Sequence, residues 1–395
     1  MNKILFVAII LLAVGAFFYS KYVKNVPVVI PFEVIRNSIL FKVEIEGETY
    51  TFLFDTGAGT VISSKLKEKL NIKATGSNYG FDFYGNSSIV SKTTLSELKL
   101  ASLANQNLEV SIITLPENFI SCGIELDGVL GLEFFKGKVV KIDLANNELT
   151  VASDISYLKE DFGRPLEITF FSGNKRPYIP ITYSDSSETV IALFDTGAIN
   201  DLLRMGKNSF LKMIEDSTIS NKSIRDTLTI NYGYGAFGKQ RDTINYRFHL
   251  PELTLSNTKF KNLIVETYDS PNKKSIIGPK ILAKAVVVLD LVKDDFYIKP
   301  YEKSVLDYSY RLDFQFQNYK VVQLADSSNA YQAGVRLGHV LKSANNLKLD
   351  SLSECDQLKI DWHEFYLQKN IQFVFESEEG EVVYDYTAAD STNVE

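Results

Sequence analysis

Cysteine is almost absent from this sequence. Its 395 residues include only two cysteines, Cys122 and Cys355, which lie far apart in the chain. Two cysteines cannot build a disulfide framework or a cysteine-rich metal cluster. Cysteines of this kind are usually small, buried, apolar residues, and we expect that role for both.

Histidine is nearly as scarce. The chain has three, His249, His339 and His363, and no two of them stand at the spacing of a metal-ligand pair. No Gly-x-Ser-x-Gly or His-Glu-x-x-His string is present, which disfavours serine-triad and zinc hydrolysis. We therefore expect no metal and no cofactor. Any chemistry must come from carboxylates.

The sequence also lacks an excess of positive charge. Lys and Arg number 42 against 49 Asp and Glu, which gives a formal net charge of -7. Without a basic field to hold a phosphate backbone, nucleic acid is not an expected partner. Hydrophobic residues, by contrast, make up 45% of the chain, with 26 Phe and 21 Tyr. This composition and length predict a folded protein of two or three domains.

An uncharged, apolar run lies at the N-terminus. Residues 4–19 carry no charge and are flanked by Lys3 and Lys21. We interpret residues 1–24 as a signal peptide or a membrane anchor, since the run is short for a span of about 20 residues and residues 14–16 offer a small-residue cleavage site. A buried helix is the alternative, although it would show one polar face. We expect an exported protein, periplasmic or extracellular, whose only membrane contact is through this segment.

One six-residue string occurs twice. Leu-Phe-Asp-Thr-Gly-Ala stands at residues 53–58 and again at residues 193–198. Such an identity arises by chance with a probability on the order of 0.01 or less at ordinary residue frequencies. A single Asp-Thr-Gly would most simply be a turn after a strand. Two copies in similar surroundings indicate a duplicated unit.

The surroundings of the two strings also match. Each copy follows an alternating segment typical of a β-hairpin, and each is followed later by an apolar-apolar-Gly element and a β-rich stretch holding an Asp. These segments are 41–54, 127–132 and 139–143 in the first copy, and 178–194, 275–278 and 286–290 in the second. The repeat is thus a whole lobe. We predict an all-β pair of lobes at residues 31–158 and 165–303, joined near residues 159–164.

The paired motif suits acid–base chemistry. If Asp55 and Asp195 meet at the centre of a dimer-like fold, they cannot both ionise and must share a proton, so one can act as a base and the other as an acid. The motif threonines can hydrogen-bond the opposite backbone, and the glycines, which lack a Cβ, let each loop approach the other carboxylate. The supporting residues are Thr56, Gly57, Thr196 and Gly197.

These motifs resemble those of the pepsin and retropepsin type of aspartic protease, particularly bacterial proteins with retropepsin-like lobes. The resemblance covers about residues 31–303 and implies a pair of β-barrel lobes, catalytic roles for Asp55 and Asp195, and extended polypeptides as substrates. Alanine follows each Asp-Thr-Gly, as in retroviral-type members, whereas residues 199–201 are bulkier than residues 59–61. The alternative hypothesis is a catalytically weak protein that binds peptides in the cleft between the lobes.

Members of that family close a glycine-rich β-hairpin flap over the substrate. Two segments are candidates, residues 79–86 and 231–238, and ordinary surface turns are the alternative. The second contains a formal Gly-x-Gly-x-x-Gly, but a strand-like stretch follows it instead of the helix that a dinucleotide site needs. The flap candidates are Tyr84, Gly85, Tyr234 and Gly235.

The pattern changes after residue 307. Residues 328–341 resemble the part of PDZ domains where a short helix ends at Ala-Gly and a turn leads into a strand. A helix at 355–366 and strands at 371–375 and 381–384 would complete a small α+β domain at residues 307–388. The resemblance implies a peptide ligand, although His339 and residues 311–314 depart from the usual carboxylate-binding pattern. A purely structural cap on the second lobe is the alternative.

Overall fold

The structure is a computed structural model of the chain. It describes residues 26–35, 37–115, 124–171, 176–183, 189–198, 202–230, 234–239, 243–269, 274–302, 314–317, 319–325, 328–353, 356, 360, 368 and 370–387. The apolar segment 4–19, Cys122, Cys355, residues 199–201 and most of the helix expected at 355–366 lie outside them. Within these ranges, no helix has the length and apolar character needed to cross a membrane.

The first lobe is built on one mainly antiparallel sheet of eight strands. The hairpin that leads into Asp55 is buried along most of its length and turns at Gly47, whose φ of 83° suits glycine. In sheet order the strands are β2 (Glu33–Ile35), β3 (Ser38–Ile45), β4 (Glu48–Phe54), β9 (Gly128–Leu130), β5 (Val61–Ser63), β8 (Leu103–Ile113), β7 (Ser87–Leu100) and β6 (Gly76–Phe81).

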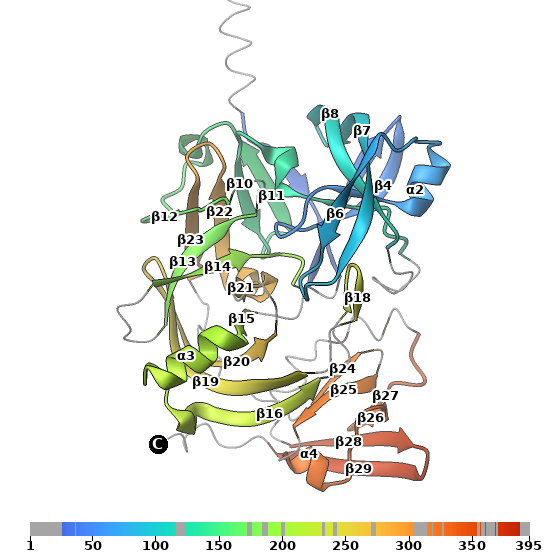
Figure 1. The fold of residues 1–395 in the computed structure, drawn as a ribbon, viewed down its shortest axis with the longest axis vertical. Helices are drawn as coiled ribbons and strands as arrows, with labels where there is room; N and C mark the ends of the chain where they lie inside the picture. The colour runs from blue at the N-terminus through green and yellow to red at the C-terminus, as the bar shows by residue number, and fades with distance from the viewer. Residues whose placement is uncertain are drawn as a thin grey trace, which may run out of the picture.

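The second lobe repeats this plan, and its sheet continues into the C-terminal residues (Figure 1). In order its strands are β13 (Tyr178–Tyr183), β14 (Thr189–Phe194), β21 (Ser275–Ile277), β15 (Leu203–Gly206), β20 (Thr258–Tyr268), β19 (Thr243–Leu255) and β16 (Ile224–Ile230). The sheet goes on through β25 (Lys320–Ala325), β26 (Val340–Ala344), β28 (Asn370–Ser377) and β29 (Gly380–Thr387), with β24 (Phe314–Gln317) beside β25 and β27 (Leu347–Lys348) beside β26. A separate small hairpin joins β17 (Tyr234–Gly235) to β18 (Gly238–Lys239).

A third sheet is shared by the two lobes. Its strands, in order, are β1 (Val28–Pro31), β11 (Glu148–Ala152), β10 (Val139–Asp143), β22 (Ala285–Asp290), β23 (Asp295–Pro300) and β12 (Leu166–Glu167). The β-rich stretches that end the two copies pair with each other, from Val139 opposite Asp290 to Ile142 opposite Val287. The duplicated units therefore meet through equivalent strands.

Helices are few and short in the described chain. The α-helices are α2 (Ser64–Lys69), α3 (Lys207–Glu215) and α4 (Asn329–Gln332), and the 3-10 helices are η1 (Leu132–Phe135), η2 (Ile155–Leu158), η3 (Asn221–Ser223) and η4 (Pro279–Ala283). η1 and η4 directly follow Gly131 and Gly278, the glycines that end the two apolar-apolar-Gly elements. With these strands and sheets, the all-β prediction is confirmed.

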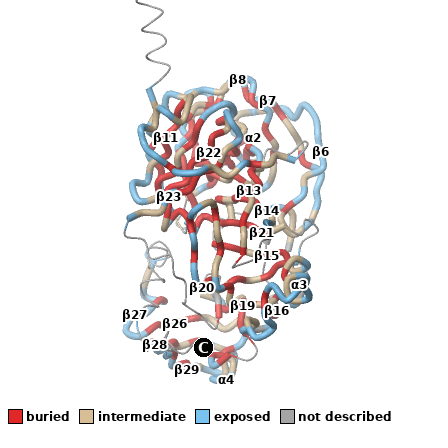
Figure 2. Tube along the Cα trace, turned by 90° about the vertical axis from the view of Figure 1, so that its left-hand side faces the viewer, coloured by how far each residue is buried: buried red, intermediate tan, exposed pale blue. Residues whose placement is uncertain are grey.

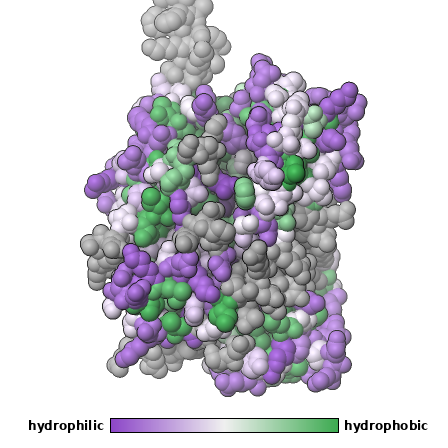
Figure 3. All heavy atoms as spheres, viewed as in Figure 1, coloured by the Kyte–Doolittle hydropathy of each residue, from purple (hydrophilic) through white to green (hydrophobic). Residues whose placement is uncertain are grey.

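Burial divides the molecule into two main cores. One apolar cluster runs through both lobes and includes Phe54 and Phe194, and a second, around Phe314 and Phe373, belongs to residues 314–387 alone. We call residues 314–387 the C-terminal module. Figure 2 shows the buried segments concentrated in the strands, and Figure 3 shows apolar patches scattered among hydrophilic residues on one face. Because the module has a core of its own, its contact with the second lobe is a separate interface.

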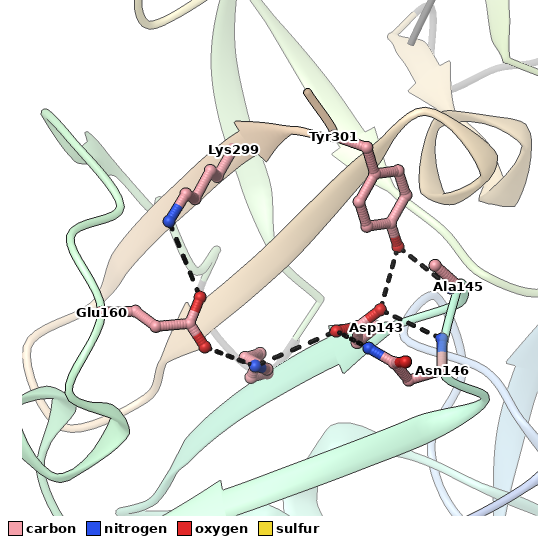
Figure 4. Close-up of polar contacts among 7 residues, drawn as sticks. Asp143, Ala145, Asn146, Glu160, Lys299 and Tyr301 are labelled. Atoms are coloured by element: carbon pink, nitrogen blue, oxygen red, sulfur yellow. Dashed lines mark hydrogen bonds and ion pairs between the residues drawn. The ribbon is translucent and has the colours of Figure 1, made fainter. Parts of the chain in front are cut away.

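The end of the second lobe is fastened to the first by polar contacts (Figure 4). The Tyr301 hydroxyl donates to Asp143 Oδ1 at 3.2 Å and accepts from the Ala145 backbone N–H at 3.1 Å. Nearby, Glu160 in the connecting segment pairs with Lys141 at 2.6 Å and with Lys299 at 3.7 Å. Burial raises the pKa of Tyr301 to about 12. These contacts hold the connection against the shared sheet.

We expect Tyr301→Phe to lower the free energy of unfolding by about 1 kcal/mol near neutral pH, because it removes the hydrogen bonds to Asp143 and Ala145. The folded-state pKa of the phenol, about 12, lies above the ordinary value of 10.0. The neutral phenol therefore stabilises the fold below pH 10, and this contribution is lost as the pH rises to 12. Urea unfolding should show the two proteins converging in stability at high pH. A constant difference would contradict this.

Candidate active site

The two Asp-Thr-Gly loops leave the ends of matching strands. Asp55 follows β4 and Asp195 follows β14, and each of these strands is paired in parallel with the strand of the apolar-apolar-Gly element. The backbone N–H of Asp55 donates to the Leu130 carbonyl at 3.1 Å, and that of Asp195 donates to the Ile277 carbonyl at 2.9 Å. The duplicated elements thus position each loop in the same way.

The motif threonines interlock the loops. Thr56 Oγ1 donates to the Phe194 carbonyl at 2.7 Å, and Thr196 Oγ1 donates to the Phe54 carbonyl at 2.9 Å. Each hydroxyl also accepts from the opposite threonine's backbone N–H, at 3.0 and 3.1 Å. Both side chains are almost fully buried, 1% and 0% exposed, so these four bonds fix the spacing of the loops.

The motif glycines provide the close approach. A Cβ on Gly57 would overlap the Asp195 carboxyl group, and one on Gly197 would overlap the Asp55 carboxyl group. Each glycine's N–H donates to the Asp of its own loop, at 2.8 Å from Gly57 and 2.9 Å from Gly197. Glycine is therefore needed at both places to bring the two carboxyl groups together.

The carboxyl groups of Asp55 and Asp195 are brought together by these glycines and influence each other's ionisation. Both retain some exposure, but the surrounding protein desolvates them, and this raises the pKa of each. The negative charge of Asp55 raises the pKa of Asp195 further. Two such groups can hold one proton between them, which allows acid–base chemistry.

Sequence analysis did not identify Arg176, which lies beside this pair. Across the β13–β14 hairpin, Tyr178 pairs with Leu193. Arg176 stands two residues before Tyr178, and Leu193 stands two residues before Asp195, so the same register places Arg176 opposite Asp195. The positive charge of Arg176 lowers the pKa of both carboxyl groups, against the larger effect of desolvation. In the first lobe the corresponding residue is Ser38. Comparing the two copies position by position could have found this difference.

A second unpredicted residue, Glu133, supports the first loop. Glu133 Oε1 accepts a hydrogen bond from the Thr60 backbone N–H, and Thr60 Oγ1 accepts one from the Gly131 N–H at 3.1 Å. Thr60 is buried, which shields these contacts from water. Lys280 stands at the matching place in the second copy. A lysine side chain cannot accept a hydrogen bond as Glu133 does, so the second loop lacks an equivalent carboxylate acceptor at this position.

The first flap candidate is a β-hairpin. β6 and β7 form its arms, and Asp82 organises the tip by accepting from the backbone N–H groups of Tyr84 at 3.0 Å and Asn86 at 2.9 Å. Gly85 adopts a φ of 82° in the turn. The Tyr84 hydroxyl accepts from Arg204 Nη1 of the second lobe at 3.5 Å. The tip thus reaches from the first lobe to the second.

The second candidate meets the first. In the hairpin of residues 234–239, which we call the second hairpin, the backbone N–H of Phe237 donates to Asp82 Oδ2 at 3.1 Å. Gly235 passes so close to Asp82 that a Cβ there would overlap its carboxylate. The backbone of Tyr234 pairs with Lys239, while the Tyr234 side chain lies outside the described part. The contact depends on Asp82 and Phe237, which sequence analysis did not single out.

Aromatic packing places the first tip over the second loop. The ring of Phe83 stacks on Tyr268 with centroids 4.5 Å apart and an interplanar angle of 23°. Phe83 packs in a cluster that also contains Leu193 and Ala198, which flank Asp195 in the chain. A cavity of about 540 Å³ borders the contact of the two hairpins and is lined by residues of α2, β7, β8 and the second hairpin. Neither Asp55 nor Asp195 lines this cavity. The first tip itself packs against residues of the strand and loop on either side of Asp195.

Two comparisons with known proteins give a match. Residues 41–134 match the family model described as aspartyl protease. Among solved structures, the aspartic proteinase from Irpex lacteus is similar to this chain at a TM-score of 0.41 and 14% sequence identity, over 70% of this chain and 98% of that one. A comparison with curated proteins gives no significant match.

Replacing Gly57 by alanine should lower the free energy of unfolding by about 1–3 kcal/mol, because the added Cβ would force Asp195 away. Gly59→Ala is the matched control. Its Cβ would have Glu133 Oε1 as its nearest neighbour, at an ordinary 3.6 Å. Urea unfolding measures both variants. Equal losses in the two would contradict the close approach described here.

Replacing Arg176 by glutamine should raise both apparent pKa values of the Asp55–Asp195 pair, because a positive charge that favours the ionised forms is removed. A carbon-13 NMR titration of the aspartate carboxyl groups would measure the shift. Arg164→Gln, in the segment that connects the lobes, serves as the control. An unchanged titration in the Arg176 variant would show that its charge does not reach the pair.

Proposed function

We propose that this chain is an aspartic endopeptidase that hydrolyses peptide bonds in extended polypeptides. The observation that carries the proposal is the pair of adjacent carboxyl groups, Asp55 and Asp195, held between loops that each lobe completes for the other. A shared proton and a fixed separation are what general acid–base hydrolysis of an amide needs. The match of residues 41–134 to aspartyl proteases supports the same activity.

The proposed reaction begins with the proton on Asp195. Ionised Asp55 takes a proton from a water molecule as the water oxygen attacks the substrate carbonyl carbon, and Asp195 gives its proton to the carbonyl oxygen. The C–N bond then breaks as the amine nitrogen accepts the proton held by Asp55. The remaining hydroxyl proton of the intermediate returns to Asp195, so the pair ends with one proton, as it began.

The hairpin tips supply the cover that this chemistry requires. Asp82 joins the first tip to the second hairpin, and Phe83 packs beside the loop of Asp195. In this arrangement the tips must part to admit a chain and can then close over it. Closure excludes bulk water, which strengthens the effect of the carboxyl charges on the bound amide. A groove between two lobes suits an extended polypeptide better than a compact ligand.

The remaining expectations belong to this proposal. Residues 1–24 would direct export or tether the enzyme to a membrane, so its substrates would be met in a periplasmic or extracellular space. The C-terminal module, predicted as PDZ-like over residues 307–388, would either bind a peptide or serve as a structural cap. The proposed reaction draws its protons and charge from the carboxyl pair and uses neither a metal nor a cofactor.

Changing either aspartate to asparagine, Asp55→Asn or Asp195→Asn, should lower peptide cleavage on the order of 10³-fold or more, because the two groups act as one unit. Asp161→Asn, in the segment between the lobes, is the control and should cleave like the wild type. Digestion of a peptide library, with and without a transition-state mimic, gives the rates. If the wild type bound peptides without cleaving any, the chain would be a peptide-binding protein.

A further inference from the structure

The C-terminal module is joined to the second lobe by strand pairing. β25 of the module lies antiparallel to β16 of the lobe, which makes the two sheets continuous (Figure 1). The paired residues are Leu228 with Ala325, Thr229 with Leu324, and Ile230 with Gln323. Through this contact, backbone groups at the end of β16 that would otherwise lie at a sheet edge gain a partner strand.

β16 is also one arm of the stem that carries the second hairpin. It ends at Ile230, which pairs with Thr243 at the start of β19, and residues 234–239 lie between the two strands in the chain. The module therefore contacts the last three residues of β16, at the base of the hairpin. Two-stranded hairpins are marginally stable alone in water, so a third strand at the base matters for their order.

The other end of the hairpin makes the contact that closes the site. The Phe237 backbone N–H donates to Asp82, and the Phe237 ring lies where a Cβ on Gly80 would overlap it. Asp82 in turn precedes Phe83, which packs in the cluster that contains Leu193 and Ala198, the residues on either side of the Asp195 loop. The second hairpin is thus held at its base by the module and at its tip by the first flap.

The interface at the base is buried. Leu228 and Ala325 are both 0% exposed, and the two main cores form around other residues. Gln323 is 5% exposed, and its side-chain Nε2 has no hydrogen-bond partner among the described residues. The strand pairing is therefore supported at this interface by backbone hydrogen bonds and by the apolar contact of Leu228 and Ala325.

We propose that the C-terminal module is a brace for the second hairpin: by pairing β25 with β16, it holds residues 234–239 in contact with the first flap over the site. The effect of the brace on catalysis rests on the proposed function: a braced hairpin would bind an extended polypeptide more tightly. The brace itself is a property of the fold. It can be measured without any substrate.

The test uses the full chain with Ala325→Asp, which places a carboxylate in the buried contact opposite Leu228. Val383→Asp, on β29 where the side chain is 48% exposed, is the matched control. Hydrogen exchange with mass spectrometry should show residues 234–239 exchanging about tenfold faster in the Ala325 variant, while residues 370–387 remain protected. For peptide cleavage, KM should rise several-fold, with kcat nearly unchanged.

A second variant keeps the proposal open to refutation if the aspartate unfolds the module. Leu228→Cys with Ala325→Cys joins register partners, whose Cα separation in an antiparallel pair suits a disulfide. Oxidation of this variant should slow exchange at residues 234–239 relative to the same protein reduced.

Two results would overturn the brace. In the Ala325→Asp variant, residues 320–325 would lose protection while residues 234–239 kept theirs. In the cysteine variant, oxidation would leave the hairpin unchanged. A wild type that cleaves no peptide would instead refute the protease proposal, and the exchange measurements would still decide the inference.

Discussion

The reciprocal hydrogen bonds of Thr56 and Thr196 are the constraint on which the site depends. Each buried hydroxyl has its carbonyl acceptor in the other lobe, so neither threonine hydroxyl donates to a group of its own lobe. A buried hydroxyl without a partner costs about 1–3 kcal/mol, which ties the order of each loop to the docking of the lobes. The shared six-stranded sheet brings the lobes to that spacing, and the motif glycines let the carboxyl groups use it.

Desolvation and the charge of Arg176 shift the pKa values of the carboxyl pair in opposite directions. Enclosure raises the pKa of both groups, and Arg176 pulls both back from one side only. The charge around the pair is asymmetric because Ser38, a neutral residue, takes the place in the first lobe that Arg176 takes in the second. Glu133 and Lys280 differ in the same way after the two apolar-apolar-Gly elements. The backbone is duplicated, whereas the charges around it are not.

Much of the architecture can be predicted from the sequence, because it depends on local patterns or on the repeat. The hairpins that lead into Asp55 and Asp195 alternate in hydrophobicity, and the repeat marks which loops are equivalent. Strands expected at 371–375 and 381–384 fall within β28 and β29. The PDZ resemblance, the domain limits and the roles of the site residues remain predictions.

Contacts between segments that are distant in the sequence could not be predicted in this way. Glycine content pointed to Tyr84 and Gly85 in the first flap, yet Asp82 makes the bond to the second hairpin. Arg176 follows only from strand register, and the pairing of β16 with β25 joins segments with no shared sequence pattern. Such partners are set by how folded elements meet, which composition and spacing do not encode.

The difference between Ser38 and Arg176 makes the surroundings of the carboxyl pair asymmetric. Two identical lobes related by a two-fold axis would present the same surroundings to a chain entering from either end. Here strand register places the cation opposite Asp195, with no counterpart opposite Asp55. Under the proposed function, a chain and its reversal would meet different electrostatic environments at the same carboxyl pair. Fusing the copies into one polypeptide lets each half diverge, so a covalently linked pair could distinguish the N-to-C polarity of a bound backbone, which a symmetric pair could not.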